Sequence, residues 1–465
     1  MKVLLVRPGA PNTLSFTNIL DSEPLELEYL HTGLKAAGYE DMIYDYICQN
    51  KPFRAVLKDY DPDVVAITGY ITQENMMKKF CMQAKKYNPN ITTIVGGVHA
   101  QINTKVFYTE FIDYIAKSES VDAFVEIVTY TGLKKNIINA NDIVNKNLIK
   151  ELTSINGMCY KLENGKWQSN PMIPIDINSL PIPDRTFFYE NRKHFRYLDL
   201  TQAANIKTSF SCPYNCKFCY CTLLNHGKYR ERDLKLVIEE LKNIDAENIT
   251  ISDDDFLVNE KRLREFVRLV RENNIKKNYV CYARADFVAS HPDIVKELAD
   301  IGFKYFLVGL EAISDEELND YNKGTSKEHN VKAIEVINST SAQCIGLMIV
   351  GLSATKKDFD DLYDWIVKHK LIHVTISIFT PIPGTPLYEE YKDKLITKKI
   401  EHWDFLHLVV EPENISRHKF YLYYRRLILK LYKRARKAGM YEYLDLGHYK
   451  RMLSKFLLRK AYLDR

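Results

Sequence analysis

The stretch Ser209-Phe-Ser-Cys-Pro-Tyr-Asn-Cys-Lys-Phe-Cys-Tyr220 holds three cysteines in the spacing C-x3-C-x2-C. Soft thiolate sulfurs are the ligands that iron–sulfur clusters prefer. The closeness of Cys212, Cys216 and Cys219 therefore predicts a cubane [4Fe–4S] cluster, with three of its irons held by the protein. The fourth iron is left open, so it can bind and reduce another molecule instead of only carrying electrons.

Two other uses of the cysteines fit the sequence less well. A structural zinc site normally has four ligands, so Cys221 or His226 would have to complete it. Disulfide bonds are disfavoured because the nine cysteines are odd in number and dispersed through a long chain. Cys221 is a bystander by default and otherwise a neighbour of the cluster.

The cysteine stretch closely resembles the radical S-adenosylmethionine (SAM) superfamily. In that family the open iron binds the amino and carboxylate groups of SAM, and the cluster's electron cleaves SAM to a 5′-deoxyadenosyl radical. Six strand-like runs with intervening helical stretches follow from Lys207, which fits the family's partial (β/α)6 barrel, with its chemistry at the carboxyl ends of the strands. The resemblance assigns SAM binding to Phe218, Asp253, Asp254, Arg284, Glu311, Gly346 and Gly351.

Three successive carboxylates, Asp253–Asp255, close the second of these runs. Their mutual repulsion costs folding free energy, so a function explains them better than chance does. The alternative is that one of them caps the following helix. Arg284 can pair with the SAM carboxylate or with Asp286, and Glu311, followed by Ala312 where the family has serine, suits a ribose hydroxyl.

Residues 1 to about 130 alternate continuous apolar runs with helical stretches, which predicts a doubly wound parallel sheet. Such sheets bind ligands beyond the carboxyl ends of their strands. This segment resembles the cobalamin-binding domain fused to many radical SAM enzymes. The matching pieces are Arg7-Pro8, Pro24–Leu30, Asp61–Val65 and Gly96–Ala100, and the implied cobalamin contacts are Pro8, Thr68, Gly69, Tyr70, Gly96, Gly97 and His99.

The same segment departs from classical cobalamin proteins in two places. The D-x-H-x-x-G motif is absent, so we expect cobalamin without a protein histidine on cobalt and with Tyr70 on its lower face. Lys117-Ser-Glu-Ser120 stands where the family usually has a Gly-Glu-Gly-Glu-like turn. Glycine at Gly96-Gly97 would let the bulky corrin approach the backbone closely. A flavodoxin-like domain that binds a plain nucleotide, or no ligand, is the alternative.

With 465 residues, the chain is long enough for two or three domains. The expected fold class is α/β, and the resemblance divides the chain into a Rossmann-like cobalamin-binding domain (1–135), a linker (136–200), the partial barrel (201–392) and a basic helical C-terminal region (393–465). The chain shows neither a signal peptide nor an apolar span near 20 residues, which favours a cytoplasmic protein. No nucleic-acid partner is expected.

The end of the chain is strongly basic. From Arg417 to Arg465 there are fifteen Lys and Arg against three acidic residues, interleaved with Tyr and Leu. This pattern predicts amphipathic helices. They would either pack on the protein with a solvated basic face or contact an acidic partner or the anionic inner face of a membrane.

The resemblance to class B radical SAM methylases implies methylation of an unactivated carbon with two SAM per turnover. One SAM would supply the methyl group through cobalamin, and the other would be cleaved to the radical. Ring contraction, cyclisation or another rearrangement without methyl transfer is the alternative, and a non-catalytic iron–sulfur protein is a distant one. The partners would be a small-molecule, lipid or peptide substrate and an external electron donor of the flavodoxin or ferredoxin type. No protein residue is assigned a catalytic role, because the cofactors carry the difficult steps.

Overall fold

The computed structural model describes residues 1–9, 20–49 and 51–440. Two compact units make up the fold. The first is built mainly from Glu23–His194, and the second from Phe195–Thr222 and the chain from Gly227 onward.

A seven-stranded sheet with the order β3-β1-β4-β5-β6-β7-β8 forms the first unit. The first five strands in that order run parallel, whereas β7 and β8 add to one edge in antiparallel fashion. The strands are β1 (Lys2–Arg7), β3 (Glu40–Asp45), β4 (Val64–Thr68), β5 (Thr92–Gly96), β6 (Tyr114–Ala116), β7 (Met158–Lys161) and β8 (Trp167–Ser169). The predicted doubly wound sheet is thereby confirmed.

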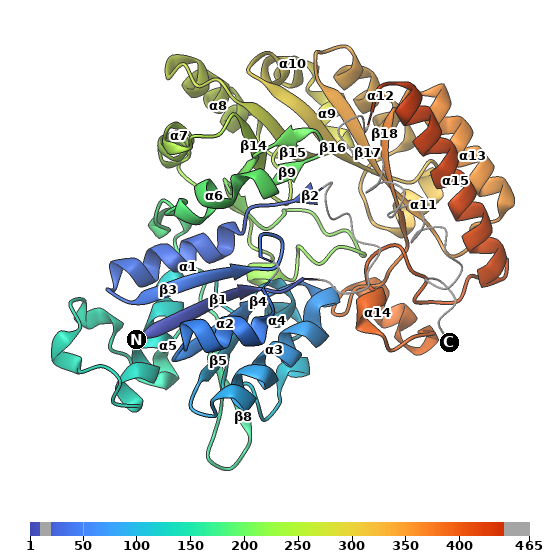
Figure 1. Ribbon diagram of the computed structural model, residues 1–465. Helices are drawn as coiled ribbons and strands as arrows, with labels where there is room; N and C mark the ends of the chain where they lie inside the picture. The colour runs from blue at the N-terminus through green and yellow to red at the C-terminus, as the bar shows by residue number, and fades with distance from the viewer. Residues whose placement is uncertain (10–19, 50, 441–465) are drawn as a thin grey trace. The chain divides into compact units, whose positions relative to one another are not determined.

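Helices cover both faces of this sheet, which explains why its strands are apolar on both sides. On one face the side chains of Leu4, Val6 and Val65 pack with those of α2 and α3 in one buried core. On the other face α1 and α5 lie against each other, where Gly33 meets Val121 (Figure 1). These helices are α1 (Leu25–Ala36), α2 (Phe53–Tyr60), α3 (Glu74–Tyr87), α4 (Val98–Ile102) and α5 (Val121–Lys134).

The segment predicted as a linker, residues 136–200, contributes β7 and β8 to this sheet. Its later part is tied to α1: the buried Arg185 pairs with Glu23, and the Phe188 amide donates to Glu28 over 2.9 Å. These contacts explain why the segment up to His194 groups with the first unit. The sequence analysis did not predict these two short strands, because the segment has low hydropathy and their exposed side chains are polar.

A six-stranded parallel sheet with the order β11-β14-β15-β16-β17-β18 forms the centre of the second unit. Figure 1 shows its helices on the outer side of the sheet, which is the arrangement of a partial (β/α)6 barrel. The strands are β11 (Ala204–Ile206), β14 (Asn248–Ile251), β15 (Asn278–Arg284), β16 (Phe303–Glu311), β17 (Gln343–Val350) and β18 (His373–Ile378). The helices are α7 (Leu234–Asn243), α8 (Glu260–Glu272), α9 (Ala285–Ser290), α10 (Pro292–Asp300), α11 (Asp315–Asp320), α12 (Lys327–Asn338), α13 (Lys356–Lys368) and α14 (Pro386–Tyr391).

Two small antiparallel sheets complete the second unit. The first barrel strand is β11, which ends at Ile206, before the first of the strand-like runs expected from Lys207. In place of that run, β12 (Ser209–Phe210) pairs with β13 (Arg230–Glu231). The cysteine stretch is therefore held between the strands of a hairpin. The other sheet has the order β10-β9-β2, from Leu200–Thr201, Arg196–Tyr197 and Leu20–Asp21.

The basic C-terminal region begins with the long helix α15 (Arg417–Lys437). Its apolar face is buried in the unit: the rings of Phe420 and Phe359 meet edge to face, and Tyr424 donates to the Ile376 carbonyl over 2.7 Å. Its exposed face carries basic residues, including Lys419, Arg426 and Lys433. The part of the predicted amphipathic region that follows residue 440 lies outside the described residues. None of the described helices is both long and apolar enough to cross a membrane.

Candidate functional site

The cysteine loop leaves β12 through Ser211, which has the left-handed φ of +63°. Cys216 is buried, and Cys212 and Cys219 are half-buried. The turn after α11 supports the loop, because Lys217 donates its amide to the Tyr321 carbonyl over 2.9 Å and Asn322 donates to the Asn215 carbonyl over 2.8 Å. The structure thus brings the three predicted ligands together in one braced loop.

Burial acts strongly on these thiols. It raises the pKa of Cys212 to about 12, with nearby carboxylates such as Asp255 adding to the effect. Burial also raises the pKa of Cys216, although Lys323 and Arg284 oppose it. A hydrogen bond from Cys221 lowers the pKa of Cys219. Thiolates in such a place require added positive charge, which bound iron supplies.

Asp253 and its two neighbours lie just beyond β14 but have different surroundings. Asp253 is buried and accepts hydrogen bonds from the Thr208 amide (2.7 Å), the Thr208 hydroxyl (2.5 Å) and the Ser209 hydroxyl (2.8 Å). Its oxygens therefore anchor the start of the cysteine loop. Asp254 is half-buried, and its charge acts on Cys212 and Cys219.

Asp255, which the sequence analysis did not single out, is the most unusual of the three. It is 2% exposed, and one of its oxygens, Oδ2, has no hydrogen-bond partner in the described structure. Burial raises its pKa to about 8, against the opposing charges of Arg284 and Lys323. A buried carboxylate oxygen without a partner is costly unless a ligand donates to it.

Arg284, at the end of β15, makes one of the two predicted contacts, the ion pair with Asp286. Its guanidinium pairs with Asp286 (Nε–Oδ1 3.0 Å) and lies 3.7 Å from both the Cys216 sulfur and the centre of the Tyr214 ring. The same group donates to the Lys323 carbonyl over 2.5 Å. Arg284 therefore links the cysteine loop to the segment after α11.

Glu311 ends β16 in the left-handed conformation, with φ of +59°. Its carboxylate pairs with the buried Lys323 over 2.8 Å, a partner that the sequence analysis did not predict. Phe218 packs against the Tyr321 ring at the same place. The two predicted glycines differ: a side chain at Gly346 would collide with Leu371 and Leu310, whereas Gly351 faces Glu317 and Tyr321 at ordinary distance. Gly346 is therefore explained by core packing.

The predicted cobalamin residues follow the carboxyl ends of β1, β4 and β5. Gly97 has φ of +88°, and a Cβ there would lie 2.4 Å from the Thr68 hydroxyl, so only glycine fits. Gln73 bridges the Pro8 carbonyl and the Tyr70 amide. The Tyr70 side chain is 56% exposed at this edge. Gly96 and the buried Gly69 lie at the same edge, so the backbone there carries small residues.

His99, which was also predicted to contact cobalamin, has its side chain buried inside the unit. It is 3% exposed, and its Nε2 lies 2.8 Å from Glu74, which is also paired with Lys78. Because the imidazole is held by a carboxylate inside the unit, His99 does not present its ring at this edge.

Comparison with known proteins finds two family models along the chain. Residues 206–366 match the Radical SAM superfamily, and residues 18–128 match the B12 binding domain. The chain thus carries a radical SAM domain together with a B12-binding domain. Its cofactors are a [4Fe–4S] cluster, SAM and cobalamin, and it is an enzyme.

Individual relatives of this radical SAM protein cover most of its length. It is 25% identical over 402 residues to an uncharacterized methyltransferase of Pyrococcus horikoshii (84% of this chain, 83% of the relative). It is 25% identical over 427 residues to the hopanoid C-3 methylase of Methylococcus capsulatus (90% and 78%). It is 24% identical over 411 residues to the anaerobic magnesium-protoporphyrin IX monomethyl ester cyclase of Cereibacter sphaeroides (85% and 64%). The solved structure of the cobalamin-dependent SAM radical enzyme OxsB shares the fold, with a TM-score of 0.69 and 15% identity over 97% of this chain and 70% of that one.

The residues present fit these cofactors. No three His, Cys, Asp or Glu side chains in the described part of the chain are grouped to hold a single metal ion. The three thiolates of a cubane cluster need not meet at one point, because each binds a different iron. The side chain of His226, the other zinc ligand considered, lies outside the described residues. The unpartnered Asp255 oxygen offers an acceptor for an ammonium group such as the one SAM carries.

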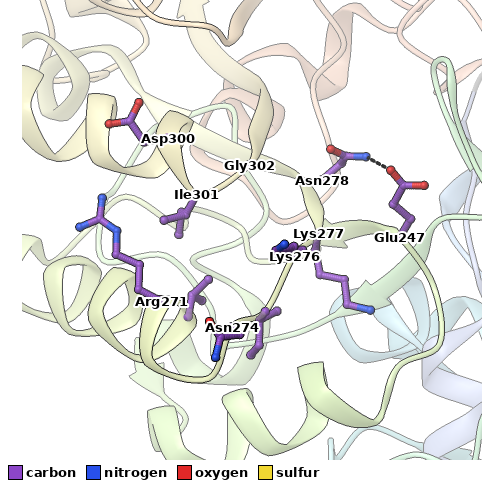
Figure 2. A pocket seen from close by; sticks show the side chains of 11 residues that line it. Glu247, Arg271, Asn274, Lys276, Lys277, Asn278, Asp300, Ile301 and Gly302 are labelled. Carbon is purple, nitrogen blue, oxygen red and sulfur yellow. Dashed lines mark hydrogen bonds between the residues drawn. The ribbon is translucent and has the colours of Figure 1, made fainter.

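An open pocket of about 450 Å³ lies at the opposite, amino-terminal ends of β15 and β16. Figure 2 shows Asn278 donating to Glu247 at its wall. The Lys277 ammonium also donates hydrogen bonds, to the carbonyls of Ile244 and Ala246. Because the side chains of Asn278, Glu247 and Lys277 are already paired and the chemistry of such barrels lies at the carboxyl ends, we assign no ligand to this pocket.

Proposed function

We propose that this enzyme methylates an unactivated carbon, using one SAM as methyl donor through cobalamin and cleaving a second SAM to the 5′-deoxyadenosyl radical. The observation that carries the proposal is the presence of a B12-binding domain and a radical SAM domain in one chain. Two relatives that span most of its length are named a methyltransferase and a methylase, which supports methyl transfer.

When bound, the cluster supplies the electron, SAM the radical and cobalamin the methyl group. The chain's own residues hold and orient these groups. Cys212, Cys216 and Cys219 are the three protein ligands of the cluster. Asp255 is assigned to the SAM amino group, because its Oδ2 is a buried acceptor with no partner among the described residues. Glu311 is assigned to a ribose hydroxyl, since its carboxylate is already oriented by Lys323.

In the first unit, we assign cobalamin to the edge formed by Thr68–Tyr70 and Gly96-Gly97. The glycines allow close approach of the ligand to the backbone. Tyr70, with its side chain exposed at this edge, is assigned to the lower face of cobalt. His99 is excluded from cobalt because it is paired with Glu74.

A radical cyclisation without methyl transfer is the second candidate. It is favoured by one observation, the similarity to a magnesium-protoporphyrin IX monomethyl ester cyclase over 85% of this chain. The two reactions differ in their SAM products. Methyl transfer releases S-adenosylhomocysteine together with 5′-deoxyadenosine, whereas cyclisation releases only 5′-deoxyadenosine.

The test is an anaerobic incubation of the reconstituted enzyme with a chemical reductant, methyl-labelled SAM and host extract. We expect S-adenosylhomocysteine and 5′-deoxyadenosine to form in equal amounts. Mass spectrometry should also find the label in a new carbon–methyl bond of the product. Cys216→Ala should give neither product, whereas Cys221→Ala should retain both. Formation of 5′-deoxyadenosine without S-adenosylhomocysteine in the presence of the converted substrate would favour the cyclisation.

For the substrate we infer an apolar molecule such as a lipid, reached at an anionic membrane surface. The exposed face of α15 supports this inference, because it carries Lys419, Arg426 and Lys433 and the helix contains no acidic residue. Each such cation contributes on the order of 1 kcal/mol near an anionic surface, screened within a Debye length. The apolar face of α15 is packed in the protein, so only electrostatic contact is expected.

Vesicle flotation tests this inference. The unchanged enzyme should float with anionic but not neutral vesicles, and high salt should release it. Changing Lys419, Arg426 and Lys433 together to Gln should abolish flotation. Changing Lys356 and Lys357, which are exposed but paired with Asp360 and Asp361, is the matched control and should leave it intact. Equal flotation on neutral vesicles, or none at low salt, would overturn the membrane contact.

A further inference from the structure

Lys323 and Glu311 form a buried ion pair beside the cysteine loop. Each residue is 7% exposed, and the Lys323 ammonium lies 2.8 Å from the Glu311 carboxylate. Two charges are seldom buried in a protein without a function or a rigid network, because desolvation costs several kcal/mol per ion. Burial of this pair therefore has a desolvation cost in the free energy of folding.

The backbone around the pair is shaped for it. Glu311 adopts a left-handed φ of +59°, which costs an ordinary residue about 1 kcal/mol or more. Gly309 leaves the space, since a Cβ there would lie 2.6 Å from the Glu311 carboxylate and 2.7 Å from the Lys323 ammonium. The Lys323 amide donates to the Leu318 carbonyl and fixes the turn after α11. Both partners are thus held by the main chain as well as by each other.

Lys323 also belongs to the segment that supports the cysteine loop. The preceding residues, Tyr321 and Asn322, hydrogen-bond to the loop backbone, and the Lys323 ammonium lies 5.9 Å from the centre of the Phe218 ring. Arg284 connects the two segments, donating to the Lys323 carbonyl over 2.5 Å and reaching the Cys216 sulfur at 3.7 Å. The ammonium is therefore fixed between Glu311 and the loop that carries Cys216.

The ammonium keeps its charge in this place. Burial by itself lowers the pKa of Lys323, but the charges of Glu311 and Cys216 outweigh it and leave the pKa raised. The positive charge is held beside the cysteine loop, 5.9 Å from the centre of the Phe218 ring, which lies between Cys216 and Cys219 in the chain. A fixed positive charge in a low-dielectric interior favours the state of a nearby group that carries an extra electron.

We propose that Lys323 is a positioning residue whose buried charge raises the reduction potential of the cluster on Cys212, Cys216 and Cys219, and which holds Glu311 oriented for SAM. The proposal rests on the cluster and SAM sites of the proposed function, but not on methyl transfer. The potential of an iron–sulfur cluster responds to nearby charge and to hydrogen bonds, so this role has a direct physical readout.

The experiment is a redox titration of the anaerobically reconstituted full-length protein, followed by the electron paramagnetic resonance signal of the reduced cluster, without SAM or substrate. Lys323→Met should lower the potential, so that at a fixed potential the ratio of reduced to oxidised cluster falls about tenfold, equivalent to about 59 mV for one electron. Lys323→Arg keeps the charge and should stay near the unchanged protein. Lys327→Met removes a half-exposed lysine that pairs with Asp315 outside this site and serves as the control.

A second pair of variants separates charge from packing. Lys323→Met leaves Glu311 buried without its partner, so it can lose iron for that reason alone. The double change Glu311→Gln with Lys323→Met makes the pair neutral, and its potential is compared with that of Glu311→Gln, which keeps the lysine. We expect the double variant to have the lower potential and both to bind SAM several-fold more weakly, measured by equilibrium dialysis.

Equal potentials in Glu311→Gln and the double variant, with equal iron content, would overturn the proposal. Failure of methyl transfer would not, because the potential and the SAM affinity are measured without substrate. A wild-type potential in a fully loaded Lys323→Met protein would likewise reduce Lys323 to a packing role.

Discussion

The strands of the barrel and those of the first unit's sheet both end at a candidate cofactor site. The two sites differ in the kind of side chain that they contain. At the barrel edge, five ionisable side chains are less than 10% exposed, namely Asp253, Asp255, Arg284, Glu311 and Lys323. At the other edge the chain presents Thr68, Gly69, Gly96 and Gly97, with Tyr70 exposed beside them. The first edge acts through fixed electrostatics, and the second through close approach of the backbone. Changes of charge and of size should therefore affect the two sites separately.

The largest separation is expected from Cys216→Ala. Loss of one of three thiolates should remove the cluster and reduce 5′-deoxyadenosine formation by more than about 100-fold, since ligand loss removes the site itself. Cobalamin uptake by the first unit should be unchanged. Iron content, 5′-deoxyadenosine and the cobalamin absorption spectrum are measured on the same preparation. Retained cleavage of SAM would refute the ligand assignment, and Cys48→Ala, in the first unit, is the control.

Gly97→Val should produce the opposite pattern. A side chain there would collide with the Thr68 hydroxyl and is strained at φ of +88°, at a cost of at least about 1–2 kcal/mol. We expect cobalamin affinity to fall roughly tenfold or more, with iron content preserved. Gly165→Val is the matched control, because Gly165 has φ of +81° but nothing within 4 Å of an added Cβ. Equal loss of cobalamin in both variants would mean that strain alone, rather than this edge, is responsible.

Two neighbouring aspartates should respond differently to the same change. Asp253→Asn replaces an acceptor of three hydrogen bonds in the cysteine loop and should destabilise the protein by roughly 1–3 kcal/mol. Asp255→Asn removes a buried oxygen without a partner in the described structure, so stability should be kept while SAM affinity falls. Thermal unfolding and SAM binding are measured for both. Weakened SAM binding in Asp253→Asn without destabilisation would exchange the two assignments.

Local spacing was sufficient to predict the features whose partners are close in sequence. The grouping of the three cysteines in one loop, the glycine pair and the last five barrel strands followed from it, because a loop and a strand terminus are local patterns. The end of the first barrel strand did not, since Ser209–Phe210 pair with β13 instead. The sequence could not decide which two of the three adjacent aspartates are buried, since that depends on the backbone direction beyond β14. It also missed Lys323, which reaches Glu311 only because α11 turns the chain back.

The C-terminal region shows the same limit. The interleaved basic and aromatic residues correctly predicted a helix, α15, but not which of its faces is free. Burial of Phe420 and Tyr424 against the barrel required the tertiary structure. For that reason point changes on the exposed face are a better test of membrane contact than truncation, which would expose this part of the core.

The smallest expected effect is on stability and concerns His31, a titratable residue of the first unit. His31 on α1 bonds to Asp41 over 2.8 Å and lies near Asp184 and Lys35. Asp41 stands near the amino end of β3, so this group is remote from the small-residue edge. The hydrogen bond to Asp41 raises the pKa of His31, against partial burial. Its contribution to stability is therefore present at acidic pH and is lost as the pH rises through the raised pKa.

His31→Gln should accordingly lower stability at pH 6 by about 0.5 kcal/mol, the usual size for a partly exposed pair, and have little effect at pH 8.5. Thermal unfolding of the full chain at both pH values measures the difference, with His418→Gln on the exposed face of α15 as control. Cobalamin affinity should not change at either pH. A pH-dependent loss of cobalamin in His31→Gln would mean that charge also affects the small-residue edge of the first unit, and the contrast between the two sites would then be one of degree.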